Sequence, residues 1–362
     1  MKSFGRPFEP IRLVDTQNYI CDLVNIEGPL VCLFRDAKRN WIYIWCDTDG
    51  VKRERWMIFP VSRPFLIAYL KRSSSLLDLV AGAESTYVLD IKSVPGDRSF
   101  DNSPSAANDG GLSTSRRLKK VALSEIEEYL PSYDSLFEEE FAPDISLARE
   151  LIPVSFDIPI DGHWFFADLN KFSKIYSQLY AFFYCTKPRF VKNIGERVRS
   201  NLSAPWMGGY SRVNLFEALK KSVPSLHDLE IKSIQYASPG QIKIEALKSV
   251  GESVAGVIKN YLENRQVMVD AEKSINTLLS SNHLRRLDLS AKLDDQLFLS
   301  SENLNFLIEK RNLIASKLGC IEEFNKLAEY SPNSVVSAKA QLALLVRVKR
   351  LAELQASGLT DL

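Results

Sequence analysis

Hydrophobic and polar residues alternate near the start of the chain in the way that β-strands require. Residues 30–34 and 41–45 are rich in β-branched and aromatic side chains, and residues 55–61 repeat this composition. Polar clusters at 36–40 and 47–50 separate these runs and are typical of turns. The pattern therefore predicts an antiparallel meander of three strands.

A helical pattern follows the meander. Apolar residues at Phe65, Leu66, Tyr69 and Leu70 fall on one side of a helix expected over 65–71. A second short helix is predicted at 76–80 and a returning strand at 86–91. Together with the meander, these elements predict a small α+β domain over residues 1–93.

Residues 94–120 interrupt this pattern. They are dense in Ser, Asn, Asp, Gly and Pro and hold few large apolar side chains, so they bury too little apolar surface to offset the entropy of ordering. We expect a flexible linker here. Residues 121–246 then form an α+β region that is acidic at 125–150 and basic at 186–221, with Ser124 predicted to cap a helix.

The second half combines a few strands with many helices. Strands are predicted at 154–160, 230–236 and 241–246, with a helix from about Asp168 to Tyr184. From 247 to 362 apolar residues recur at helical spacing, and Gly319 stands where a glycine ends a helix. The predicted fold class is α+β, with a small antiparallel meander-plus-helix N-terminal domain and a larger C-terminal domain that combines a few strands with a helical bundle over 247–362.

Composition and charge narrow the class of protein. The 46 basic and 45 acidic residues balance, so no overall attraction to nucleic acid or membrane is implied. Five scattered cysteines without a CxxC pair indicate a reducing compartment and argue against disulfides and a structural zinc. No apolar run reaches the ~18 residues of a membrane span, and the N-terminus lacks the apolar core of a signal peptide. We expect a cytoplasmic protein without cofactor or membrane partner.

Two strings carry a resemblance to known proteins. Gly28-Pro29-Leu30, Tyr43-Ile44-Trp45 and the run from Arg55-Trp56 to Pro60-Val61-Ser62 resemble the GPL…YxxW…RWxxxPVS pattern of an uncharacterised bacterial family, a domain of unknown function, although Trp45 follows Tyr43 by two positions instead of three. The string from Ile231 to Gly240 is similar to a strand–turn–strand of uncharacterised bacterial proteins, some of them encoded near antiviral defence genes. The resemblance implies a setting in phage defence or mobile elements, and no activity.

Motifs for catalysis are mostly missing from the sequence. It contains no Walker loop, GxSxG elbow, HExxH or Rossmann glycine fingerprint. Asp90-Ile91-Lys92 matches the acid-x-lysine limb of a metal-dependent nuclease, with Asp78 or Asp36 as the second acid; such tripeptides also end ordinary strands. Asp157, Asp161, His163 and Asp168 could ligate a metal, or could serve as turn and capping residues. The sequence favours a non-enzymatic protein over an enzyme, and it indicates no catalytic residue.

A basic, aromatic segment is the best candidate for nucleic-acid binding. Phosphate contacts from Lys and Arg and stacking on aromatic rings are what such a groove needs. The same charges could instead dock on the acidic residues 125–150 or on an acidic partner protein. The candidate residues are Lys187, Arg189, Lys192, Arg197, Arg199, Trp206, Tyr210 and Arg212.

Strand parity singles out a candidate partner-binding surface. Trp41, Tyr43 and Trp45 point to one face of their strand, and Ile42, Ile44 and Cys46 to the other. The aliphatic face is the natural core, whereas the aromatic face either packs against the 65–71 helix or stays exposed to a partner. The leading hypothesis is a non-enzymatic interaction or regulatory subunit of a bacterial antiviral-defence or mobile-element system that acts through protein–protein contacts. DNA or RNA binding and a cryptic nuclease are the alternatives.

Overall fold

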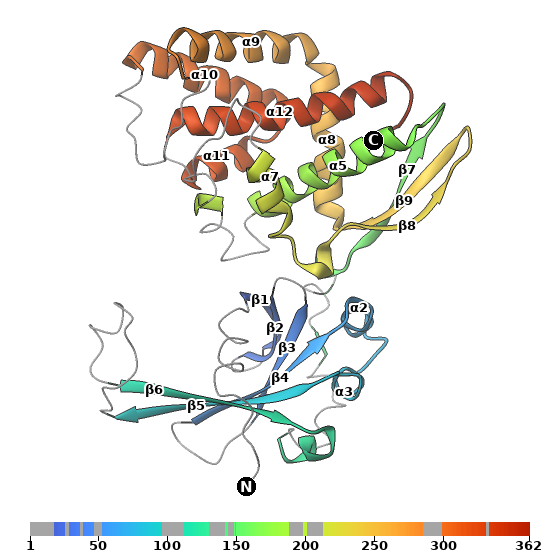
Figure 1. The fold of residues 1–362 in the computed structure, drawn as a ribbon, viewed down its shortest axis with the longest axis vertical. Helices are drawn as coiled ribbons and strands as arrows, with labels where there is room; N and C mark the ends of the chain where they lie inside the picture. Colours follow the sequence, from blue (N-terminus) through green and yellow to red (C-terminus); the bar gives the residue numbers. More distant parts are fainter. Residues whose placement is uncertain are drawn as a thin grey trace. The chain divides into compact units, whose positions relative to one another are not determined.

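The chain forms two compact units of mixed α+β structure, which confirms the predicted fold class. The first contains Met1–Ile152 with Pro224–Leu226, and the second contains Pro153–Val223 with His227–Leu362. Figure 1 draws the ribbon of both units in the computed structural model. The structure describes residues 18–25, 29–36, 39–46, 53–95, 112–129, 142–143, 148, 150–187, 198–200, 213–284, 299–330 and 333–362.

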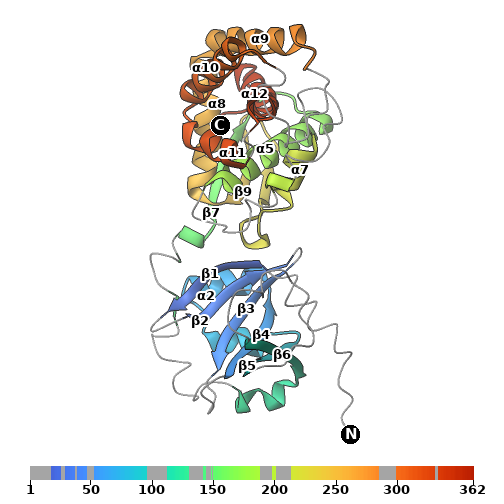
Figure 2. The ribbon, with the colours of Figure 1, turned by 90° about the vertical axis from the view of Figure 1, so that its left-hand side faces the viewer.

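The first unit is built on a six-stranded antiparallel sheet whose strands follow one another in sequence order. Figure 2 shows the twist of this sheet. The predicted meander corresponds to its second, third and fourth strands. The strands are β1 (Asn18–Asn25), β2 (Pro29–Arg35), β3 (Asn40–Cys46), β4 (Arg53–Val61), β5 (Thr86–Pro95) and β6 (Leu112–Val121).

Strand β6 corrects the prediction of a flexible linker. Residues 112–120 pair with β5 along its whole length, and 96–111 lie outside the described residues. An edge strand needs few apolar residues, and Arg116, Arg117, Lys119 and Lys120 are exposed along β6. The low hydrophobicity of residues 112–120 is therefore that of an edge strand and not of a flexible linker. The pattern also gave no prediction for β1, which pairs with β2 at the other edge of the sheet.

Two helices cover the aliphatic face of this sheet. Helices α2 (Arg63–Leu70) and α3 (Leu76–Ala81) match the predicted ones, and their apolar residues join one core with Ile42, Ile44 and Cys46. The helix expected after Ser124 is a short 3-10 helix, η2 (Leu123–Glu128), which begins after Ala122. The predicted parity of strand β3 is thus confirmed.

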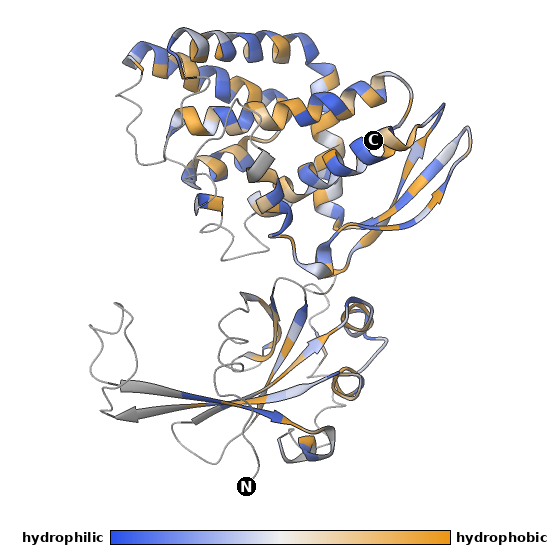
Figure 3. Cartoon of the chain, in the orientation of Figure 1, coloured by the Kyte–Doolittle hydropathy of each residue, from blue (hydrophilic) through white to orange (hydrophobic). Residues whose placement is uncertain are grey.

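The second unit packs a bundle of helices beside a three-stranded antiparallel sheet of order β7-β9-β8. Its strands are β7 (Val154–Ile160), β8 (Glu230–Gln235) and β9 (Gly240–Ala246). Hydrophobic positions recur along its helices in Figure 3. The long helices are α5 (Phe166–Thr186), α8 (Lys248–Glu263), α9 (Arg265–Ser281), α10 (Ser301–Leu318) and α12 (Ser334–Ala356); the shorter ones are α7 (Val213–Lys220) and α11 (Ile321–Tyr330). The short 3-10 helix η5 (Ser225–His227) crosses the division between the units, because Leu226 belongs to the first and His227 to the second.

The division of the chain differs from the predicted boundaries at 93, 120 and 246. Residues 121–152 belong to the first unit, where Val121, Ala148 and Leu151 enter the core. Strands β7 and β9 share one core with the helices after residue 246, so 153–246 is not a separate region. Gly319 ends α10 with a φ of +71°, as predicted for a glycine at this position.

Candidate functional site

The aromatic face of β3 is largely closed. Trp41 is 2% exposed and Tyr43 5%, and both belong to a cluster with Cys32, Ile58 and Leu89. Helix α2 lies on the opposite, aliphatic face, so the predicted packing of the aromatic face on this helix is wrong. Trp45 is partly exposed. Burial leaves little of Trp41 and Tyr43 for a partner to contact.

The aromatic cluster also satisfies its polar atoms locally. The Trp41 Nε1–H donates to Asp36 Oδ2 over 2.8 Å, and the Phe34 and Tyr43 rings lie 4.1 Å apart between centroids. Burial raises the pKa of the Tyr43 hydroxyl. These contacts are typical of a packed second core.

The acids proposed for a nuclease take part in structural contacts. Asp90 Oδ1 accepts from Arg55 Nε over 2.7 Å, in a mostly buried ion pair across β4 and β5. Asp78 forms a capping box with Ser75 at the start of α3, which lowers the pKa of its carboxyl. The backbone of Lys92 lies within β5, which continues to Pro95, and it pairs with Arg53 of β4 and Ser115 of β6. The nuclease hypothesis stays a prediction.

The candidate metal ligands of the second unit hold turns and a helix end. Asp168 accepts from the backbone N–H of Phe165 at the start of α5, over 3.1 Å. Asp161 accepts from the Ser238 hydroxyl and from the Gly162 N–H, and these bonds lower the pKa of its carboxyl. Within the described residues, no three His, Cys, Asp or Glu side chains gather as a metal site would require.

Asp157, His163 and His227 lie in different surroundings. Asp157 lies 3.9 Å from Lys243, and His163 is exposed. His227 is fully buried with its Nδ1 2.8 Å from the Tyr184 hydroxyl. His163 and His227 therefore differ in exposure, and within the described residues neither belongs to a group of three potential metal ligands.

Most of the predicted nucleic-acid segment lies outside the described residues. Lys187 is described, and its Nζ donates to the Ser249 carbonyl oxygen over 2.6 Å, while desolvation lowers the pKa of its ammonium group. Arg199 is described and exposed. Nucleic-acid binding stays a prediction. The residues outside the description are Arg189, Lys192, Arg197, Trp206, Tyr210 and Arg212.

An exposed apolar surface lies on β8. Ile231 and Ile234 pair across the strands with Ile244 and Ile242 of β9, so all four project from the same face of the sheet. Ile242 and Ile244 are buried in the core with α5 and α8, whereas Ile231 is 51% exposed. The core-forming face of the sheet thus continues onto β8, where its apolar side chains are exposed.

The start of α5 extends this surface. The Trp164 backbone N–H donates to the Tyr236 hydroxyl over 3.3 Å, so the residue after β8 meets the chain just before Phe165 and Phe166. Phe166 is 86% exposed. Eleven large hydrophobic side chains are exposed among the described residues, and five of them lie here. We call these five residues the β8 face: Phe165, Phe166, Ile231, Ile234 and Tyr236.

The two edge strands of this sheet, β7 and β8, differ in what lies along their edges. At the end of β7, Asp161 N–H donates to the Leu359 carbonyl and Asp361 N–H donates to the Pro159 carbonyl, so the C-terminal residues cover this part of the edge. On β8, Lys232 is the extra residue of a bulge, and its Nζ lies about as close to Glu230 as to Glu245, at 3.0 and 3.2 Å. A bulge and a lysine both disfavour the pairing of an edge strand with a further strand.

Comparison with known proteins gives no identity. Neither a family model nor a curated protein nor a solved structure matches the chain. The two resemblances stated from the sequence therefore stay predictions. Among the described residues, no helix combines the length and apolar character needed to cross a membrane.

Sequence reasoning did not identify the β8 face. Its signal was present, because Ile231, Ile234 and Tyr236 are spaced as a strand with one extra residue would space them. Exposure was the missing information. Which strand of a sheet is left uncovered depends on how far the helices reach, and this is a property of the packed unit.

Proposed function

We propose that this protein is an interaction subunit that binds a partner protein through the β8 face. One observation carries the proposal: the sheet face that forms the core of the second unit continues onto β8, where large apolar side chains are exposed. Contiguous exposed apolar surface marks binding sites more often than scattered apolar residues do. Phe and Tyr also supply large contact area at low cost in side-chain entropy.

The surface favours an amphipathic helix of the partner over an added strand. Lys232 and the bulge blunt the β8 edge, so main-chain pairing there is disfavoured. The sheet face next to Ile231 and Ile234 stays open, while helices α5 and α8 already pack on the same face at Ile242 and Ile244. A helix from the partner would continue this layer and bury its apolar side.

The biological setting is the one that the sequence resemblance implies. A role in bacterial antiviral defence or in mobile elements is supported by the strings at Gly28–Ser62 and Ile231–Gly240. The second string includes β8 itself, so the proposed surface lies within the residues that carry the resemblance.

Affinity purification of the full chain from its native host tests the proposal. The test variant is Ile231→Thr with Ile234→Thr, which keeps β-branched residues in the strand and removes apolar surface. The matched control is Val267→Thr with Val269→Thr, two exposed apolar residues on α9. We expect wild type and control to retain the same partner protein. The affinity of the test variant for this partner should be at least about tenfold lower, which corresponds to about 1.4 kcal/mol of binding free energy.

Three results would overturn the proposal. The first is equal recovery of the partner with all three proteins. The second is loss of the partner with the control as well as with the test variant. The third is a dimer of the purified chain, measured by light scattering, that the Ile231→Thr/Ile234→Thr variant abolishes, since the β8 face would then be occupied by a second copy.

A further inference from the structure

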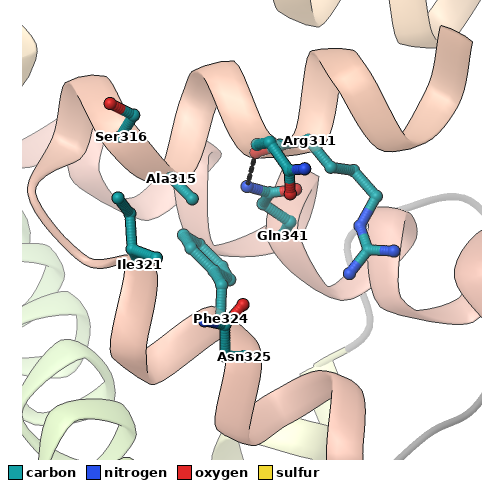
Figure 4. A pocket seen from close by; sticks show the side chains of 8 residues that line it. Arg311, Ala315, Ser316, Ile321, Phe324, Asn325 and Gln341 are labelled. Carbon is teal, nitrogen blue, oxygen red and sulfur yellow. Dashed lines mark hydrogen bonds between the residues drawn. The ribbon is translucent and has the colours of Figure 1, made fainter.

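A cleft between α10, α11 and α12 has a volume of about 380 Å³, within the range of roughly 300–1,000 Å³ typical of small-ligand sites. Its floor is buried, because Gln341 is 1% exposed and Ala315 and Phe324 are also buried. Its mouth is open at Ile321, an exposed residue. Figure 4 shows the lining side chains from the three helices: Arg311, Asn312, Ala315, Ser316, Ile321, Phe324, Asn325 and Gln341.

Gln341 leaves one polar atom unsatisfied in this cleft. Its Nε2 donates to the Arg311 carbonyl oxygen over 2.8 Å, which fixes the orientation of the amide. Its Oε1 is buried and has no hydrogen-bond partner among the described residues. A buried acceptor without a partner costs free energy, so a ligand that donates an N–H at this point gains affinity.

The rest of the lining defines the chemistry of such a ligand. Phe324 and Ile321 offer apolar surface for a flat ring, and Asn312 and Asn325 add amides that can pair with a heterocycle edge. Of the eight described lining residues none is acidic, and Arg311 is positively charged. A ring with an N–H donor joined to an anionic group combines these features.

We propose that this cleft binds a nucleoside monophosphate. The base lies against Phe324 and donates an N–H to Gln341 Oε1, and the phosphate is attracted by Arg311. Amide side chains and aromatic faces are the groups that proteins use to read and stack nucleobases. The proposal is independent of the β8 face, whose residues do not line the cleft.

Calorimetric titration of the full chain with AMP, GMP, CMP and UMP tests this site, with ribose 5-phosphate as the anion without a base. Gln341→Met removes the acceptor at similar side-chain length. Gln355→Met is the matched control, because Gln355 also lies on α12 with a buried, unsatisfied Oε1 but does not line the cleft. Ser316→Trp blocks the mouth from an exposed position and tests the site without disturbing the core.

We expect at least one nucleotide to bind saturably below about 1 mM and ribose 5-phosphate to bind at least about tenfold more weakly. Gln341→Met and Ser316→Trp should each weaken the nucleotide at least about tenfold, and Gln355→Met should change its affinity less than about twofold. The proposal is overturned if none of the four nucleotides binds, if Ser316→Trp binds like wild type, or if ribose 5-phosphate binds as tightly as the nucleotide.

Discussion

The two sheets of this protein differ in how completely they are covered. In the first unit β3 is buried on both faces, by aromatic side chains around Trp41 on one and by helices α2 and α3 on the other. In the second unit the core-forming face is covered at β9 but exposed at β8. The aromatic run that looked most like a binding surface is a core, and the inconspicuous strand β8 carries the open apolar surface.

The difference shows which property of a sheet can be predicted locally. Parity places Trp41 and Tyr43 on one face and Ile42 on the other because successive side chains alternate. Cover depends on elements far away in the sequence, so it does not follow from the strand itself. Aromatic content alone therefore says little about whether a strand face binds a partner.

The largest expected effect is at Trp41. Trp41→Ala should destabilise the first unit by about 3–5 kcal/mol, because it leaves a cavity in a closed cluster and removes the bond to Asp36. Hydrogen exchange of the β3 and β4 peptides in increasing urea measures this loss. Trp45→Ala, at a more exposed position of the same strand, is the control and should cost less than half as much. Equal costs would mean that the aromatic face is as open as the β8 face.

The second sheet offers a pair of isoleucines that face each other across strands. Ile242→Thr should lower the free energy of unfolding by about 2–3 kcal/mol, because a hydroxyl replaces buried apolar surface. Ile234→Thr should cost roughly 0.5 kcal/mol, since its side chain is already exposed. Urea denaturation of both variants gives the comparison. Similar losses would show that β8 is covered in solution.

The aliphatic face of β3 can be probed by pH through Cys46. Burial raises the pKa of this thiol from 9.0 to about 11. Between these values the unfolded chain loses the proton that the folded chain keeps, so stability is complete below pH 9 and falls as the pH rises towards 11. The expected slope is at most about 1.4 kcal/mol per pH unit. Cys46→Ala should reduce the slope, and an unchanged slope would mean that this thiol is not buried.

Two glycines of α8 test how closely the helix covers the sheet. A Cβ at Gly251 would lie 2.9 Å from the Phe156 ring of β7, whereas a Cβ at Gly256 meets no atom within 4 Å. Gly256→Ala should stabilise the second unit by about 0.5–1 kcal/mol, because alanine favours the helix. Gly251→Ala should instead destabilise it by roughly 1 kcal/mol through crowding. Thermal unfolding of the two variants measures this difference in stability. Equal stabilisation by both would show that α8 does not pack closely against Phe156 of β7.

The pattern of hydrophobic and polar residues predicted much of the fold, but it did not predict the β8 face. Strong periodicity predicted β3, α5 and the C-terminal helices, and Gly319 marked the end of α10. Strand β6 was missed because Arg and Lys dominate an edge strand, and the boundary near residue 152 was missed because β7 and β9 share a core with distant helices. Gln341 gave no local signal, since its buried Oε1 depends on contacts with Arg311 thirty residues away.

Site-specific photo-crosslinking in the native host tests the account most directly. A benzoyl-phenylalanine at Phe166, an exposed aromatic position of the β8 face, is compared with the same group at Phe306 on α10, also exposed. The account predicts a single crosslinked partner protein from position 166 and none from position 306. The same crosslinks from both positions, or none from position 166, would contradict it.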